Sequence, residues 1–417
     1  MRAIGLVALV VTQACWLQVG AGPRRTGSTG LENEITVATV ADLAVAWTAA
    51  ATGTSPREAL VSGDAAYVRS PGSVTALRVA DGAVRWSTDS LGGWAAPAIV
   101  ANRLRVPVSA GQCRLVTLDL ATGATVDTVG FGPPDTSVFG GASSCAPGDA
   151  VASGSTVTMP WYYLGTSPSP GCAGDHAYSV GPGVAAIDVG EPGGWSHYGT
   201  HTGCGTPPTP LPPAYGAAST DRPDRALVAV SGGVRSLGCT GTGCPAPWSV
   251  STDGTVVGPP VILGNGDVAV AVDDGRVLVV DGASQSVEWT GQAGSALARP
   301  LAADGSSLFA VTSTGAVVAF PVDGCGAATC TPAWTATLSS PATARPSVGG
   351  GVLYVGTADG DVAAFPASGC GAPVCGPLWT AATPAAVTAP PAIADGAVVV
   401  GSSDGTITAF RLPAAGS

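Results

Sequence analysis

The residues with the clearest chemical spacing are three pairs of cysteines, each pair separated by four residues. Two pairs lie in near-identical stretches, DGCGAATCTPAW and SGCGAPVCGPLW, and the third lies in LGCTGTGCPAPW. Cysteines at such spacing bind zinc or form disulfides. Zinc would need two further ligands for each pair, and no histidine lies near any of them. The sequence therefore favours three short disulfides: Cys239 with Cys244, Cys325 with Cys330, and Cys370 with Cys375.

Cysteine number also predicts the compartment. The chain has 11 cysteines, and setting Cys15 aside leaves an even number that can pair fully in an oxidising environment. The first residues, MRAIGLVALVVTQACWLQVGA, have one arginine, a short apolar run and small residues, as in an export signal. We expect cleavage after about Ala21. Lipidation of Cys15 is the alternative, which Thr12 and Gln13 fit poorly.

A second group of chemically capable residues lies between about residues 130 and 215, where Gly, Pro and Ser are frequent. The three histidines and many aromatic residues are concentrated there, and loops on a rigid scaffold commonly bind ligands. Asp175, His176, His197 and His201 could gather a metal, but surface histidines in polar loops are the simpler interpretation, so we expect no metal. The candidate binding surface comprises Trp161, Tyr162, Tyr163, Asp175, His176, Tyr178, His197, Tyr198 and His201.

Overall composition excludes several classes of function. The formal net charge of -11, without any basic run, argues against nucleic-acid binding, because phosphate contacts need clustered cations. The 60 Gly and 35 Pro indicate frequent turns and many short strands. Beyond the N-terminus, no segment has the unbroken apolarity of a membrane span.

A repeat of about 45 residues supplies these strands. Its unit has a Pro-led apolar segment, two alternating runs separated by Gly turns, and a last segment with Trp, which predicts four strands. The C-terminal copy, APPAIADGAVVVGSSDGTITAF, stops after three strands, whereas LAVAWTAA around Trp47 is a fourth strand without the other three. The N-terminal strand can thus complete the last unit. We predict an all-β, eight-bladed β-propeller closed in this way.

The stretch GVLYVGTADGDVAAF and the terminal Trp resemble the PQQ-like (pyrroloquinoline-quinone-like) propeller repeat, which also occurs in an outer-membrane assembly lipoprotein of Gram-negative bacteria. The resemblance covers about residues 43–411. It implies that the short cysteine pairs lie between the third and fourth strands of their blades. It also raises an alternative function, a PQQ-dependent oxidoreductase with calcium. The adjacent-cysteine disulfide and C-x-x-C-H haem motif found in such enzymes are absent from this sequence.

Four cysteines then remain, and they can pair in three ways. Cys113 and Cys172 occupy equivalent loops of successive blades, and each precedes a further cysteine by 32 residues. This equivalence favours Cys113 with Cys145 and Cys172 with Cys204.

Together these observations predict the organisation and role of the chain. We expect an export or lipoprotein signal over 1–21, a linker over 22–42, the propeller over 43–411 and a short tail over 412–417. Insertions are expected at about 130–148, 164–182 and 199–214. The expected function is a monomeric, non-catalytic binding or scaffold module at the cell envelope, without a cofactor, whose partner is an envelope protein, a peptide or a glycan. An extracytoplasmic sensor part is a third hypothesis.

Overall fold

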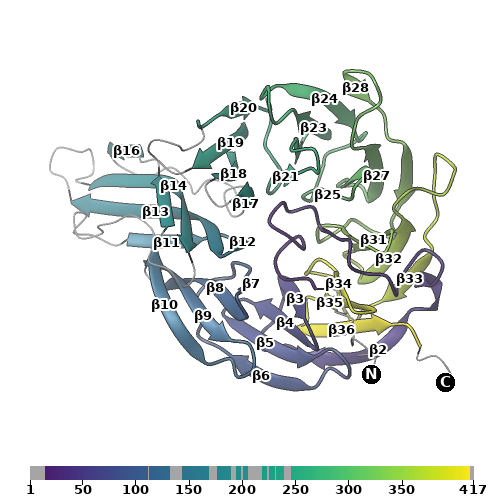
Figure 1. Cartoon of the computed structure of the whole chain (residues 1–417), viewed down its shortest axis with the longest axis horizontal. Helices are drawn as coiled ribbons and strands as arrows, with labels where there is room; N and C mark the ends of the chain where they lie inside the picture. The colour runs from purple at the N-terminus through teal and green to yellow at the C-terminus, as the bar shows by residue number, and fades with distance from the viewer. Residues whose placement is uncertain are drawn as a thin grey trace, which may run out of the picture.

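The chain folds into eight sheets arranged around a centre like the blades of a propeller (Figure 1). The computed structural model describes residues 15–110, 112–131, 143–168, 176–188, 194–198, 201–204, 218–222, 225–230, 232–238 and 246–413. In this part of the chain the one helical stretch is the 3-10 turn η1 (Val40–Asp42), and no helix is long and apolar enough to cross a membrane. The all-β, eight-bladed fold predicted from the repeat is confirmed.

In most blades four successive strands follow one another from the inner to the outer position. Blades 1 and 2 comprise β3 (Glu58–Ser62), β4 (Ala65–Ser70), β5 (Ser73–Arg78) and β6 (Val84–Thr88), then β7 (Ala98–Val100), β8 (Arg103–Ala110), β9 (Gln112–Asp119) and β10 (Thr125–Phe131). Blade 3 has six strands: β11 (Ser143–Pro147), β12 (Val151–Ser153), β13 (Thr156–Pro168), β14 (His176–Asp188), β15 (Gly194–Tyr198) and β16 (His201–Cys204). Blade 4 comprises β17 (Ala218–Arg222), β18 (Arg225–Val230), β19 (Gly233–Gly238) and β20 (Ser249–Ser251).

Of the next three blades, blades 5 and 7 each gain a strand from another part of the chain. Blade 5 comprises β21 (Val261–Ile262), β22 (Val268–Ala271), β23 (Arg276–Val280) and β24 (Val287–Gln292), to which β28 (Thr329–Cys330) is added. Blade 6 comprises β25 (Ala302–Ala303), β26 (Ser307–Val311), β27 (Ala316–Pro321) and β29 (Trp334–Thr337). Blade 7 comprises β30 (Ser347–Gly349), β31 (Val352–Gly356), β32 (Asp361–Pro366) and β33 (Trp379–Ala382), with β1 (Ser28–Thr29) added inside.

Blade 8 closes the ring as the sequence predicts. It comprises β34 (Ala392–Ala394), β35 (Ala397–Gly401), β36 (Thr406–Arg411) and the N-terminal β2 (Ala44–Ala50). The strand β2 pairs antiparallel with β36, and Thr48 lies opposite Thr408. Because the outer strand comes from the other end of the chain, the two ends of the propeller are joined by a strand pair.

Burial explains why the blade strands have such apolar sequences. Every residue of β31 and β35 is buried, because neighbouring blades cover both faces of each sheet. An outer strand such as β2 instead buries its tryptophan, Trp47, and leaves most of its other residues exposed. The apolar core of this propeller therefore lies between the blades.

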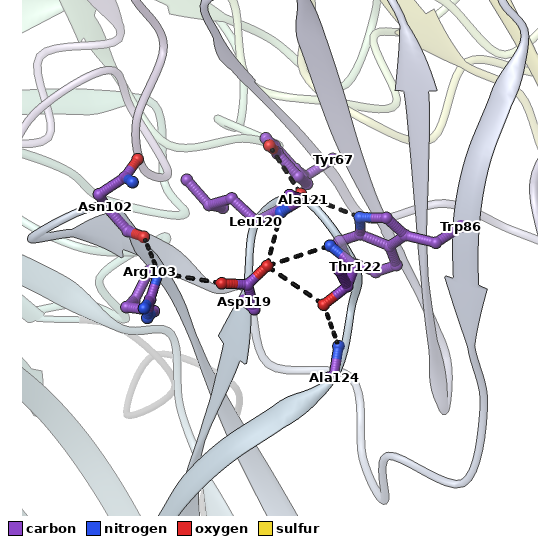
Figure 2. A network of polar contacts seen from close by, with 9 residues as sticks. All are labelled: Tyr67, Trp86, Asn102, Arg103, Asp119, Leu120, Ala121, Thr122 and Ala124. Carbon is purple, nitrogen blue, oxygen red and sulfur yellow. Dashed lines mark hydrogen bonds and ion pairs between the residues drawn. The ribbon is translucent and has the colours of Figure 1, made fainter.

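Around blades 8, 1 and 2 the blades are joined by tryptophan docking. Figure 2 shows Trp86 of β6, whose Nε1–H donates to the carbonyl of Leu120 in the next blade at 2.9 Å. Trp47 and Trp379 bond to the carbonyls of Val79 and Leu43 at 2.7 and 2.9 Å in the same way. Trp379 belongs to blade 7, and blades 8, 1 and 2 each receive one of these tryptophans from the preceding blade, so we call these three blades the docked arc.

The loop beneath Trp86 has an ordered shape of its own. The Asp119 carboxylate accepts bonds from the backbone N–H groups of Ala121 and Thr122 at 3.0 and 3.1 Å and pairs with Arg103 at 3.1 Å (Figure 2). Gly123 has a φ of +71°, and a Cβ atom there would lie 2.5 Å from the Trp86 ring. Glycine is required at this position because the loop lies flat on the indole.

Blades 5, 6 and 7 are joined by longer loops of blades 6 and 7, which are closed by disulfides, as predicted. Cys325 pairs with Cys330 and Cys370 pairs with Cys375, both with a Cα–Cα distance of 5.7 Å. The first loop provides β28, which runs parallel to β24 of the preceding blade, and the second loop pairs in the same way with β29. We call these blades the clasped arc, since each loop holds the outer edge of its neighbour.

A third disulfide, between Cys113 and Cys145, joins β9 of blade 2 to β11 of blade 3 and confirms that predicted pairing. Cys204 lies in β16, whereas Cys172, Cys239 and Cys244 lie outside the described residues. The pairings of these four cysteines stay predictions.

Candidate functional site

A segment that the sequence analysis assigned to a signal and a linker fills the centre of the ring. We call residues 15–35 the strap. It runs past the inner strands of successive blades in the middle of Figure 1, in purple. Its carbonyl groups accept hydrogen bonds from inner-strand N–H groups, at 2.9 Å between Val61 and Trp16 and 2.7 Å between Val348 and Gly27. The strap therefore occupies the place where a propeller has its central channel.

Side chains of the strap are also held tightly. Trp16 and Arg25 are fully buried. The Gln18 amide makes two bonds with the backbone of Ala152, one donated by its Nε2 at 3.1 Å and one accepted by its Oε1 at 2.6 Å. At its C-terminal end, the Glu32 carboxylate accepts the N–H of Gly396 at 3.1 Å. The strap is thus bonded to blades on opposite sides of the channel.

Two cationic and two acidic side chains come together around the strap. Arg25 pairs with Asp149 at 3.2 Å, and Arg345 donates from Nη1 to the carbonyl of Arg25 at 3.2 Å. Glu58 is buried in the same environment, and desolvation raises its pKa to about 8 although Arg345 opposes the shift. Desolvation likewise lowers the pKa of Arg345 to about 10. Blades 1, 3 and 7 and the strap each contribute one member of this buried cluster.

The described channel does not fit a quinone cofactor with calcium. A small ligand normally occupies a concave pocket lined by a few convergent polar groups. Here the strap lies along the channel with Trp16 and Arg25 fully buried, and Asp149 already accepts from Arg25 and from the backbone N–H of Ala96 at 2.9 Å. Among the described residues no three or more His, Cys, Asp or Glu side chains form a group that could hold a metal ion.

Blade 3 carries most of the predicted binding surface. Its strands β13 and β14 have 13 residues each and extend outward from the ring (Figure 1). Their backbone register places Trp161 opposite Gly183, and Gly183 opposite Tyr198 of β15. Trp161 is buried beside the Cys113–Cys145 disulfide and does not lie on the surface.

Other predicted residues are brought onto the same sheet. Tyr162 and Tyr163 lie in β13, His176 and Tyr178 in β14, and His197 in β15. His201 of β16 is paired with Val180, next to the position of Tyr178 along β14. The backbone therefore gathers these positions on one six-stranded blade. Asp175 lies outside the described residues.

Sequence reasoning missed the strap and its charged cluster. Arg25 and Asp149 are 124 residues apart, so no local spacing connects them. One signal was present in the repeat. Arg345 stands just before β30 and Glu58 begins β3, at a position where the copy in blade 2 has the uncharged Ala96. Charged side chains at a position that faces the centre of a ring require an internal partner.

Comparisons with known proteins agree with this fold. The family model described as outer membrane protein assembly factor BamB matches residues 25–156 and 322–413, more than half of the chain. No curated protein sequence matches the chain.

Solved structures of two kinds resemble the chain. BamB from Moraxella catarrhalis has a TM-score of 0.60 and 17% identity, over 90% of this chain and 99% of that one. Quinohemoprotein alcohol dehydrogenase ADHIIG from Pseudomonas putida HK5 has a TM-score of 0.66 and 13% identity, over 99% of this chain and 82% of that one. Quinohemoprotein alcohol dehydrogenase from Comamonas testosteroni has a TM-score of 0.64 and 15% identity, over 100% of this chain and 84% of that one. Similarity at such identities shows the fold, and the family model shows the family. The chain belongs to the family of the outer membrane protein assembly factor BamB.

Proposed function

We propose that this protein is a non-catalytic binding or scaffold propeller that works outside the cytoplasm, at the cell envelope. The observation that carries the proposal is the strap, which fills the channel with Trp16 and the Arg25–Asp149 ion pair. A partner must then bind on the exterior of the ring. Three disulfides support an oxidising compartment.

The six-stranded blade 3 is the exterior surface that best fits this role. The strands β13 and β14 are longer than those of the other blades, and the Cys113–Cys145 disulfide fixes their base to blade 2. A rigid, protruding sheet rich in aromatic residues suits contact with a partner protein, a peptide or a glycan. The candidate contact positions on it remain Tyr162, Tyr163, His176, Tyr178, His197, Tyr198 and His201.

A deletion tests the surface. Removing residues 164–180 and 199–214 takes out the end of the long hairpin together with Cys172 and Cys204. We expect a folded ring by circular dichroism and a loss of crosslinking to envelope components. The control is Val374→Ser on the opposite, clasped arc, where Val374 is 68% exposed. Unchanged crosslinking by a folded deletion variant would show that blade 3 is not the binding surface.

A ligand titration tests the non-catalytic part of the proposal. Pyrroloquinoline quinone and calcium are added to the oxidised protein while its melting temperature is followed, because a ligand of the folded state must raise it. We expect no saturable rise. A saturable rise would favour a quinone-dependent oxidoreductase instead, and assays with alcohols and a dye acceptor would follow.

A further inference from the structure

The innermost strand of each blade is a sheet edge. Its N–H groups that face the central channel need hydrogen-bond acceptors. Here the strap provides acceptors for seven blades in turn. The inner-strand N–H groups donate to the strap in chain order at the following distances: Val61 to Trp16 O 2.9 Å, Ile99 to Leu17 O 2.8 Å, Ala152 to Gln18 Oε1 2.6 Å, Thr220 to Pro23 O 2.9 Å, Ile262 to Arg24 O 2.9 Å, Ala303 to Thr26 O 2.6 Å, and Val348 to Gly27 O 2.7 Å.

This arrangement is that of a bound peptide that curves around the channel, with turns closed by the bonds from Ala21 N–H to Gln18 O and from Arg25 N–H to Gly22 O. Its main-chain groups give general affinity, whereas a few side chains fix the register, as in other cases of strand addition. Trp16 and Arg25 supply two buried anchors. A third constraint is Gly20, where a Cβ atom would lie 2.0 Å from Nη2 of Arg345.

The segment that connects the strap's channel contacts to the rest of the chain lies outside these contacts. Gly30 has no neighbour within 4 Å of a built Cβ atom, and Leu31 is 49% exposed. The chain therefore reaches the surface between the strap's channel contacts and the Glu32 contact with blade 8.

We propose that the inner edges of the blades form a binding channel for a polypeptide that curves past them, which the strap fills in cis. The ligand it takes presents backbone carbonyls to the inner strands, an aromatic ring at the Trp16 position, no side chain at the Gly20 position and a cation opposite Asp149. This inference is independent of the proposed role of blade 3.

The experiment uses the full chain with a protease recognition sequence inserted between Gly30 and Leu31. After cleavage, the strap fragment is released in moderate urea and removed. A fluorescent synthetic peptide of residues 15–30, with Cys15→Ser, is then added under native conditions. We expect a saturable rise in anisotropy and recovery of the melting temperature of the uncleaved protein. If the ring unfolds on release, we expect the peptide to restore its β-sheet spectrum.

A charge exchange separates specific binding from general stickiness. A peptide with Arg25→Glu should bind at least tenfold more weakly, because its carboxylate would face Asp149. Asp149→Arg in the ring should recover binding of that peptide and weaken binding of the original one. A ring that neither binds the peptide nor regains structure with it would overturn the proposal. So would equal binding of both peptides.

Discussion

The docked and clasped arcs hold neighbouring blades together in two different ways. In the docked arc, Trp47 and Trp86 donate their Nε1–H groups to loop carbonyls of the next blade. In the clasped arc, Trp289 and Trp334 are buried and their Nε1 atoms have no hydrogen-bond partner among the described residues. There the loops make strand pairs instead, with Thr290 N–H donating to Ala328 and Thr335 N–H to Pro373 at 2.9 and 2.8 Å.

The difference shows that the loop before the outer strand can hold the neighbouring blade in two ways, by accepting an indole hydrogen bond or by pairing with its outer strand. A glycine lies on the indole in both arcs, since Cβ atoms at Gly82 and Gly369 would lie 2.5 and 2.7 Å from Trp47 and Trp334. The glycine–tryptophan contact is therefore the shared feature. A short loop adds one side-chain hydrogen bond to it, whereas a long loop adds backbone pairing and needs a disulfide to limit its freedom.

The largest effect should come from the strap, which serves both arcs. Trp16→Ala should lower the free energy of unfolding by about 3–5 kcal/mol, because it empties a fully buried site. Urea denaturation measures the loss. A chain that begins at Gly22 also lacks Trp16 and should be destabilised relative to one that begins at Cys15.

Hydrogen exchange of the Trp16→Ala variant shows whether both arcs lose stability. We expect the inner-strand amides of Val61 and Val348, one in each arc, to lose protection together. A loss confined to one arc would mean that the strap does not connect them.

Removing one clasp should have the next largest effect, and it should stay local. The double substitution Cys325→Ala and Cys330→Ala opens a loop of short sequence separation, which should cost roughly 2 kcal/mol through the unfolded chain. The Thr290 amide should exchange faster, since its acceptor lies in that loop. Protection around Trp86 and around the intact Cys370–Cys375 clasp should not change. Faster exchange throughout the ring would contradict a local clasp.

The buried Glu58 of the docked arc, which interacts with Arg345 of the clasped arc, predicts that the free energy of unfolding depends on pH. Its pKa rises from the ordinary 4.5 to about 8 on folding, mainly through desolvation, with Asp149 adding to the rise and Arg345 and Arg25 opposing it. The folded state then binds the proton more tightly than the unfolded state. This contribution to stability is complete below about pH 4.5 and is lost as the pH rises to about 8.

Glu58→Gln should remove this part of the pH dependence. We expect the variant to match the parent near pH 4.5 and to be the more stable protein at pH 9. Urea midpoints at several pH values measure it. A parent and variant with parallel pH profiles would show that Glu58 does not titrate in this range.

The sequence predicted the elements that recur and missed those that do not. Blade strands, ring closure through β2 and the Cys325 and Cys370 loops follow from patterns that repeat at fixed spacing. The strap follows no such pattern, because most of its bonds to the blades are accepted by backbone carbonyls, which every residue has. Trp16 and Leu17 continue an apolar run that also fits an export signal. Pairs such as Arg25 and Asp149 come together only when the ring closes, so the sequence alone could not predict them.

The smallest effect is the most direct test of the two arcs, because the chain offers a matched pair of tryptophans. Trp86 packs beside Tyr67 and Trp289 beside Phe320, at ring distances of 5.9 and 6.2 Å and with similar tilts. Phenylalanine at either position removes similar apolar area, but it removes an indole hydrogen bond only at Trp86. We therefore expect Trp86→Phe to cost about 1 kcal/mol more than Trp289→Phe.

Urea denaturation of both variants gives this difference, and Trp47→Phe and Trp334→Phe repeat it at a second pair of junctions. If all four substitutions cost the same, the docking hydrogen bond contributes nothing beyond packing. The arcs would then differ only in their loops. A larger cost in the clasped arc would instead mean that Trp289 and Trp334 anchor the disulfide loops, and that the unpaired indole groups are the price of close packing against those loops.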